Sequence, residues 1–159
     1  MSKAYFSAGC FWGVQYYFKR LEGVAKTAVG FMGGEIVSPT YKQVKTGTTG
    51  HLETIEVEYD TSSVSYEALV RYFFEIHDFE QVDGQGVDIG TQYLSAIWFA
   101  DTQERDTAIK VFGELMRLGY HPATQIRQTT AFYPAEDYHQ DYLDQLGETP
   151  ECHVWRKVF

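Results

Sequence analysis

The order of predicted strands and helices constrains the fold of this chain more than any other sequence feature. Alternating or β-branched runs predict strands, and apolar residues spaced three and four apart predict helices. The first six elements follow the order strand, helix, strand, strand, helix, strand. The predicted strands are residues 3–8, 24–34, 52–60, 93–100 and 125–133, and the predicted helices are residues 10–21, 65–78, 102–119 and 135–147.

That order is typical of a ferredoxin-like core, a split βαβ arrangement of the α+β class. We therefore expect a two-layer sandwich with one added strand and added helices. The last dozen residues have no period and predict an irregular C-terminal tail over residues 147–159. No repeat or linker divides the sequence, so we expect one domain over residues 1–159.

Charge and composition exclude several classes of function. The net charge is −9 and no Lys/Arg cluster is present, which argues against a nucleic acid partner. No apolar run approaches the roughly 20 residues of a membrane span, and no signal sequence follows Met1. We expect a cytoplasmic protein. Two cysteines are too few for a secreted disulfide scaffold, so each thiol must be considered singly.

Cys10 lies at the predicted turn from the first strand into the first helix. The first backbone N–H groups of a helix are unpaired and carry partial positive charge, which favours a thiolate and hence a nucleophile. The alternative is a buried free cysteine that only packs. Position alone leaves both alternatives open.

Glu53 shares a strand face with the apolar residues Ile55, Val57 and Tyr59. A carboxyl group on that face loses hydration, which raises its pKa and lets it act as a general acid near neutral pH. The alternative is a glutamate at a strand end that turns to solvent, which is the commoner case. Glu56, on the other face, is expected to be an ordinary solvated charge.

Two further stretches carry polar and aromatic side chains suited to a binding site. Glycines bracket Asp88 shortly before Tyr93, and Tyr41 lies in a long polar loop. Phenol hydroxyls stay neutral at physiological pH and can donate to a substrate oxygen. Phe11 and Trp12 beside Cys10 suit an apolar pocket, although Phe11 also fits the core stripe. In a chain with 12 tyrosines, any one of them is more often part of the packing.

Four segments, in order along nearly the whole chain, resemble the signatures of the A-type peptide methionine sulfoxide reductases. They are GCFWG (9–13), SPTYKQVKTGTTGHLE (38–53), HDFEQVDGQGVDIGTQYLSAI (77–97) and FYPAEDYHQDYL (132–143). The resemblance implies a ferredoxin-like domain that reduces the S epimer of methionine sulfoxide, free or in proteins. It implies no metal and no organic cofactor. We expect a monomer.

The resemblance also implies a role for each candidate residue. Cys10 resembles the nucleophile, Glu53 the acid, and Tyr41 and Tyr93 the tyrosines that bind the sulfoxide oxygen. Asp88 matches the acidic residue of the substrate site, and Phe11 and Trp12 match the pocket for the methyl group of the substrate.

Attack by Cys10 leaves a sulfenic acid on the enzyme, and the only other thiol is Cys152. We expect a mobile tail to bring Cys152 over the site as the resolving thiol. A Cys10–Cys152 disulfide would then be reduced by thioredoxin, the donor that the family implies, or by a dithiol. The alternative is an incidental tail cysteine.

Leu94 departs from the family pattern, which commonly has arginine after TQY, and so removes a charge near the substrate mouth. The five histidines do not have zinc-site spacing, and His51 and His139 are expected to be structural. Two other functions are considered. A cysteine hydrolase would pair Cys10 with a histidine base, and a binding module would use Phe11 and Trp12 without chemistry.

Overall fold

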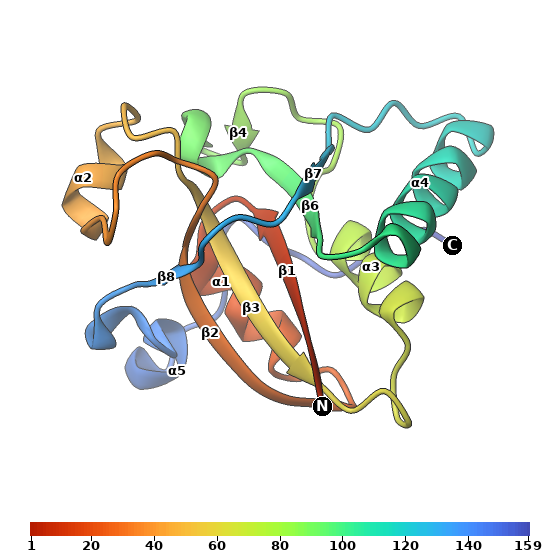
Figure 1. Cartoon of the computed structure of the whole chain (residues 1–159), viewed down its shortest axis with the longest axis horizontal. Helices are drawn as coiled ribbons and strands as arrows, with labels where there is room; N and C mark the ends of the chain where they lie inside the picture. The colour runs from red at the N-terminus through yellow and green to blue at the C-terminus, as the bar shows by residue number, and fades with distance from the viewer.

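A computed structural model describes residues 1–159 and shows a mixed α/β protein built on one six-stranded, mostly antiparallel sheet (Figure 1). The strand order is β7-β6-β1-β3-β2-β8, and only the β6–β7 pair is parallel. A separate hairpin pairs β4 with β5. The strands are β1 (Ser2–Ala8), β2 (Val24–Met32), β3 (Leu52–Tyr59), β4 (Gly84–Gln85), β5 (Asp88–Ile89), β6 (Ser95–Phe99), β7 (Gln125–Gln128) and β8 (Tyr133–Pro134).

The helices follow the predicted positions, with additions in the predicted loops. No helix is long and apolar enough to cross a membrane. Two short 3₁₀ helices, η1 (Thr91–Tyr93) and η2 (Asp137–His139), precede β6 and α5. The α-helices are α1 (Phe11–Phe18), α2 (Tyr41–Lys45), α3 (Tyr66–Glu75), α4 (Thr102–Arg117) and α5 (Tyr142–Leu146).

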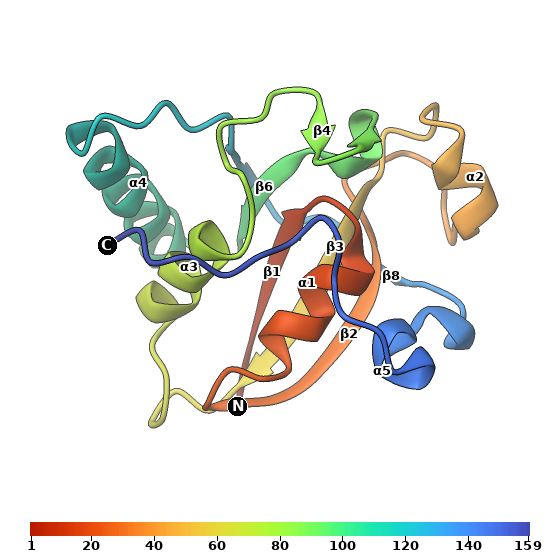
Figure 2. The ribbon, with the colours of Figure 1, turned by 180° about the vertical axis from the view of Figure 1, so that it is seen from behind.

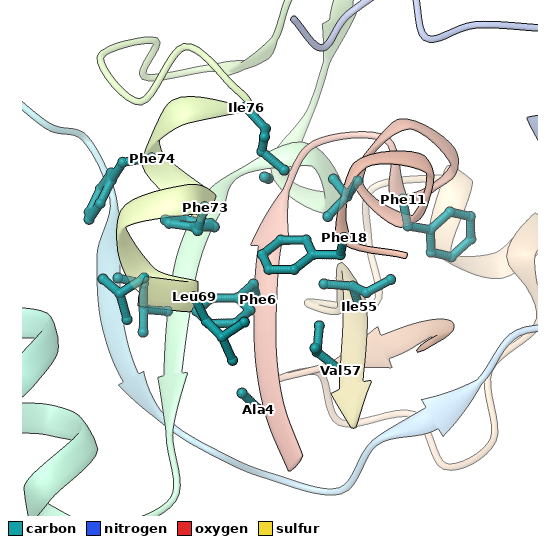
Figure 3. Packing of buried hydrophobic residues seen from close by; sticks show 14 of the residues in the cluster. Ala4, Phe6, Phe11, Phe18, Ile55, Val57, Leu69, Phe73, Phe74 and Ile76 are labelled. Carbon is teal, nitrogen blue, oxygen red and sulfur yellow. The ribbon is translucent and has the colours of Figure 1, made fainter. Parts of the chain in front are cut away.

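The main hydrophobic core lies between the sheet and helices α1 and α3, which cover the same face (Figure 2). Figure 3 shows Phe18 of α1 and Phe73 of α3 on either side of Phe6 from β1, with ring centroids 5.2 and 5.3 Å from the Phe6 ring. All three side chains are fully buried. The period of two in the strands and of three to four in the helices sets this packing, because each element buries one face.

The opposite face of the sheet carries a smaller cluster around Trp98, which is also fully buried. The indole Nε1 of Trp98 donates to Ser7 Oγ at 2.9 Å, and Ser7 Oγ lies 2.9 Å from Thr54 Oγ1. Leu94, the residue that departs from the family pattern, packs against this cluster. The polar side chains on this face of the sheet therefore form hydrogen bonds with one another.

The predicted strand over residues 125–133 is wrong, because the segment forms two strands at opposite edges of the sheet. β7 pairs with β6, and β8 pairs with β2 through Gly30 and Pro134. Between them the chain crosses the sheet (Figure 1), and Phe132 packs on Tyr5 with ring centroids 5.5 Å apart. The chain between β7 and β8 packs over the second face of the sheet. This tertiary packing outweighs the local strand propensity of residues 125–133.

Two other predicted elements differ in detail. The helix predicted over residues 135–147 is interrupted at Asp141, whose φ of 54° lies in the left-handed region, and so forms η2 and α5. The long polar loop contains α2, which starts with a capping box between Thr40 and Gln43.

The C-terminal segment has no regular structure after α5, but it is held against the molecule rather than free. It runs past the start of α1 and along α3 (Figure 2). The backbone N–H of Arg156 donates to the carbonyl oxygen of Glu75 at 2.9 Å, and that of Val158 donates to Glu75 Oε2 at 3.2 Å. The expectation of a mobile tail is therefore wrong for residues 156–158.

Candidate active site

Cys10 occupies the N-cap position of α1, where the sequence placed it, and follows Gly9, whose φ is 88°. Hydrogen bonds from the backbone N–H groups of Trp12 and Gly13 lower the pKa of the thiol. Burial and the nearby Glu53 act in the opposite direction and outweigh them, so the pKa of Cys10 is raised. The expectation that the helix start favours a thiolate is therefore wrong, because burial and Glu53 favour the protonated thiol.

Glu53 points into the protein, as the strand parity predicted, and is 2% exposed. Its Oε1 accepts a hydrogen bond of 3.1 Å from the backbone N–H of Phe11, the first residue of α1. Burial raises the pKa of Glu53 to about 8, although the Phe11 hydrogen bond opposes the shift. At neutral pH this carboxyl group therefore holds a proton beside Cys10.

Tyr41, Tyr93 and Asp88 surround these two groups from three different segments, α2, η1 and β5. The pKa of Tyr41 is raised by burial and then by the charges of Glu53, Tyr93, Cys10 and Asp88. Burial raises the pKa of Tyr93 to about 12, with smaller contributions from the same charged groups. Both phenols stay protonated and can donate hydrogen bonds across the physiological range.

Most of the predicted site residues line one cavity of about 370 Å³. Phe11 and Glu53 do not line it. Glu53 is buried behind the start of α1, where it is bonded to the backbone N–H of Phe11. The ring of Phe11 is 1% exposed and packs beneath the cavity on Phe31 and Tyr41, with ring centroids 5.6 and 6.1 Å away. The predicted residues in the cavity wall are Cys10, Trp12, Tyr41, Asp88, Tyr93 and Cys152.

The family model described as "Peptide methionine sulfoxide reductase" matches residues 2–158. A peptide methionine sulfoxide reductase MsrA from Nautilia profundicola is 43% identical over 152 residues, covering 96% of this chain and 88% of that protein. The chain belongs to the peptide methionine sulfoxide reductase family.

Solved structures give the same family fold. Mxr1 from Saccharomyces cerevisiae in reduced form is 32% identical, with a TM-score of 0.91 over 98% of this chain and 92% of that one. Mxr1 in complex with Trx2 is 21% identical, with a TM-score of 0.66 over 98% of this chain and 90% of that one. The second likeness concerns the fold alone.

The aromatic wall of this reductase is held by residues whose part the sequence did not reveal. Trp12 Nε1 donates to His139 Nδ1 at 3.1 Å, and the ring of His139 stacks on Tyr41 with centroids 4.2 Å apart. Glu136 Oε1 accepts from the backbone N–H of Tyr41 at 3.2 Å. Tyr142 stacks on Trp12 with ring centroids 3.9 Å apart. These contacts join segments more than 90 residues apart, which no local pattern signals.

Cys152 lies at the mouth of the same cavity as a free thiol. Its Sγ donates to Asp88 Oδ2 at 3.6 Å, and burial raises its pKa. Both cysteines are therefore at the reductase site without any movement of the C-terminal segment from another part of the molecule. The sequence predicted that Cys152 reaches this site, but not that it lies there without such a movement.

Two of the histidines of this reductase lie within hydrogen-bond distance of protein groups through both ring nitrogens. His51 Nδ1 accepts from the backbone N–H of Gly34 at 3.0 Å, and its Nε2 lies 2.7 Å from the carbonyl oxygen of Ile36. His77 lies between the carbonyl oxygen of Phe73 and Ser95 Oγ, at 2.7 and 2.8 Å. No group of three or more His, Cys, Asp or Glu side chains is arranged to hold a metal ion.

Proposed function

We propose that this chain reduces the S epimer of methionine sulfoxide to methionine, in free and protein-bound form, and so repairs oxidised proteins. One observation carries the proposal: the Cys10 thiol lines the cavity, and the buried Glu53 carboxyl, which holds its proton near neutral pH, is hydrogen-bonded to the backbone N–H of Phe11, the next residue. A sulfoxide sulfur becomes a good electrophile only when its oxygen is protonated or strongly hydrogen-bonded. A thiol and an acid on the two sides of the S–O bond meet that need.

In the proposed chemical step, Glu53 gives its proton to the sulfoxide oxygen as the sulfur of Cys10 attacks the sulfoxide sulfur. The proton of Cys10 passes to the Glu53 carboxylate, so Glu53 ends as it began. The oxygen moves to Cys10 as a hydroxyl group, and a thioether leaves. The sulfoxide is reduced by two electrons, and the sulfur of Cys10 is oxidised to a sulfenic acid.

The other residues of the site position the substrate. The hydroxyl groups of Tyr41 and Tyr93 donate to the sulfoxide oxygen, since both phenols keep their protons. Trp12 lines the cavity and contacts the methyl group of the substrate, while Phe11 supports that pocket from beneath. Asp88 binds a polar group of the substrate at the cavity mouth.

Cys152 is proposed as the resolving thiol because it lies at the cavity that holds Cys10. It attacks the sulfenic sulfur of Cys10 and forms a disulfide, and one water leaves. Thioredoxin or a small dithiol then reduces the disulfide by exchange, and no metal or organic cofactor takes part. A disulfide that is broken in every turnover needs a reducing compartment, which favours the cytoplasm.

We also propose that the whole chain is one catalytic domain and acts as a monomer. The order β6-β1-β3-β2, with α1 and α3 on one face, supports a ferredoxin-like core. β7, β8 and the other helices are additions to it. Residues 147–159 form a tail that supplies Cys152 to the site of the same chain.

Replacing Cys152 by serine is expected to separate the two halves of the cycle. Cys152→Ser should form one methionine per enzyme and then stop when thioredoxin is the reductant, because the Cys10 sulfenic acid has no partner thiol. Methionine formed per enzyme, measured with thioredoxin in excess, checks this. Sustained turnover driven by thioredoxin would remove Cys152 from the mechanism.

A product assay tests the proposed function itself. The protein is incubated with dithiothreitol and a mixture of the two methionine sulfoxide epimers, and the products are resolved by chiral chromatography. We expect complete loss of the S epimer and retention of the R epimer. A protein that consumed neither epimer but hydrolysed esters would instead be a cysteine hydrolase, and one without turnover would be a binding module.

A further inference from the structure

His153, the residue after Cys152, is 2% exposed and is buried against the segment that carries Cys10. Its Nε2 lies 2.6 Å from the carbonyl oxygen of Ala8, the last residue of β1. A carbonyl oxygen only accepts, so the hydrogen is on Nε2 and His153 donates it. Burial lowers the pKa of His153, which keeps the ring neutral with its hydrogen on Nε2. The His153 side chain thus links the segment that carries Cys152 to the residues just before Cys10.

The first turns of α1 are shaped to accept this ring. A Cβ atom on Gly13 would collide with Nδ1 of His153, so only glycine leaves the space that the ring fills. One helical turn further along, the Tyr17 hydroxyl donates to the carbonyl oxygen of His153 at 3.3 Å. Residue 153 is therefore fixed to α1 through both its side chain and its backbone.

Cys152 itself is held much less firmly on its other side. No hydrogen bond between backbone groups involves residues 149–152, and α5 is followed by Gly147, whose φ of 66° reverses the chain. The Cys152 sulfur accepts a hydrogen bond from the backbone N–H of Val87. The contact between Cys152 Sγ and Asp88 Oδ2, at 3.6 Å, must be given up when the thiol attacks. His153 is therefore the nearest firm anchor for the resolving thiol, and its fixed point lies beside Cys10.

We propose that His153 is a positioning residue for disulfide formation: by donating to the Ala8 carbonyl oxygen it holds Cys152 within reach of Cys10. This inference rests on the proposed function, in which Cys152 resolves the sulfenic acid. His153 takes no part in the reduction of the sulfoxide. It sets the effective concentration of the Cys152 sulfur at the Cys10 sulfur.

The step that His153 assists is balanced without a further reactant. The sulfur of Cys152 attacks the sulfur of Cys10, the S–O bond of the sulfenic acid breaks, and the thiol proton leaves with the hydroxyl group as water. The sulfur of Cys152 must approach Cys10 near the line of the breaking S–O bond. A misplacement of about 1 Å can cost on the order of 10²-fold in such a step, so the anchor matters for rate rather than for fold alone.

Three variants isolate the hydrogen bond. His153→Leu removes the donor and keeps an apolar group of similar size, whereas His153→Gln keeps an amide Nε2 donor close to the position of the imidazole Nε2. His153→Asn keeps a polar amide but is shorter, so its donor does not reach the Ala8 carbonyl oxygen. His121→Leu, at an exposed histidine outside the site, is the matched control. Thermal unfolding of each variant shows whether it is folded.

Each protein is mixed with the S epimer without reductant, and quenched samples are assayed for methionine, free thiols and sulfenic acid trapped by a 1,3-dicarbonyl probe. We expect His153→Leu and His153→Asn to form methionine but to lose thiols about 10²-fold more slowly than wild type, with trappable sulfenic acid on Cys10. His153→Gln and His121→Leu should behave as wild type. A merely structural role would slow methionine formation and thiol loss together.

The inference is overturned if folded His153→Leu closes the disulfide at the wild-type rate, or if His153→Gln is as slow as His153→Leu. Should His153→Leu fail to fold, His153→Asn decides by the same readout. Failure of the proposed function looks different: wild type itself would then retain one free thiol after forming methionine.

Discussion

Replacing Cys10 by serine is expected to abolish methionine formation, with a loss of at least about 10⁴-fold in the single-turnover rate. A hydroxyl group is a far weaker nucleophile than a sulfur atom, and it cannot accept the oxygen to form a sulfenic acid. Burial raises the pKa of Cys10, so we expect the thiol to give its proton to the Glu53 carboxylate as its sulfur attacks. Methionine formed in a single turnover, quantified after acid quench, gives the measurement.

The serine variant also distinguishes the reductase from a hydrolase. Serine is close in size to cysteine, so the unfolding temperature should change by only a few degrees, which excludes loss of fold as the cause. Serine at this position could still support slow ester hydrolysis. Methionine formation by Cys10→Ser at more than a small fraction of the wild-type rate would contradict the assignment of the nucleophile.

Replacing Glu53 by glutamine should slow the chemical step by about 10²- to 10⁴-fold, the usual contribution of a general acid. Glutamine keeps an oxygen that can accept the hydrogen bond from the Phe11 N–H, at present 3.1 Å long, so the start of α1 is preserved. It has no acidic proton to give to the sulfoxide oxygen. Single-turnover methionine formation measures the effect without interference from the resolving step.

The matched control for this substitution lies on the same strand. Glu56→Gln replaces a carboxylate that accepts from the Tyr5 hydroxyl at 2.8 Å and lies on the face of β3 opposite to Glu53. Its chemical step should stay within about twofold of wild type, as for most surface substitutions. If the two glutamine variants react equally fast, Glu53 is not the acid.

Features that depend on short stretches of sequence were predicted correctly. The helix start at Cys10 follows from an apolar period that begins after a strand, and the burial of Glu53 follows from strand alternation. Both need only a few neighbouring residues. The same alternation also places Ile55 and Val57 in the main core, so the local pattern and the tertiary structure agree.

Features that depend on contacts between distant segments were not predicted. The pKa of Cys10 was expected to fall because the helix start is a local property, whereas burial and Glu53, which together raise it, come from the tertiary structure. The anchor between His153 and Ala8 joins opposite ends of the chain. Residues 125–133 look like one strand because the sequence does not show that the chain must cross and cover the second sheet face.

Glu53 must hold its proton in order to act as the general acid, and the pH dependence of the chemical step measures this. With a pKa of about 8, Glu53 is protonated below that pH and ionised above it. The rate of methionine formation at low substrate concentration should therefore be constant below about pH 7 and fall as pH rises through 8, approaching tenfold per unit. Glu53→Gln should lose this inflection. A wild-type rate that rises with pH through the same range would show that loss of the Cys10 thiol proton limits the reaction. Glu53 would then not act as the acid.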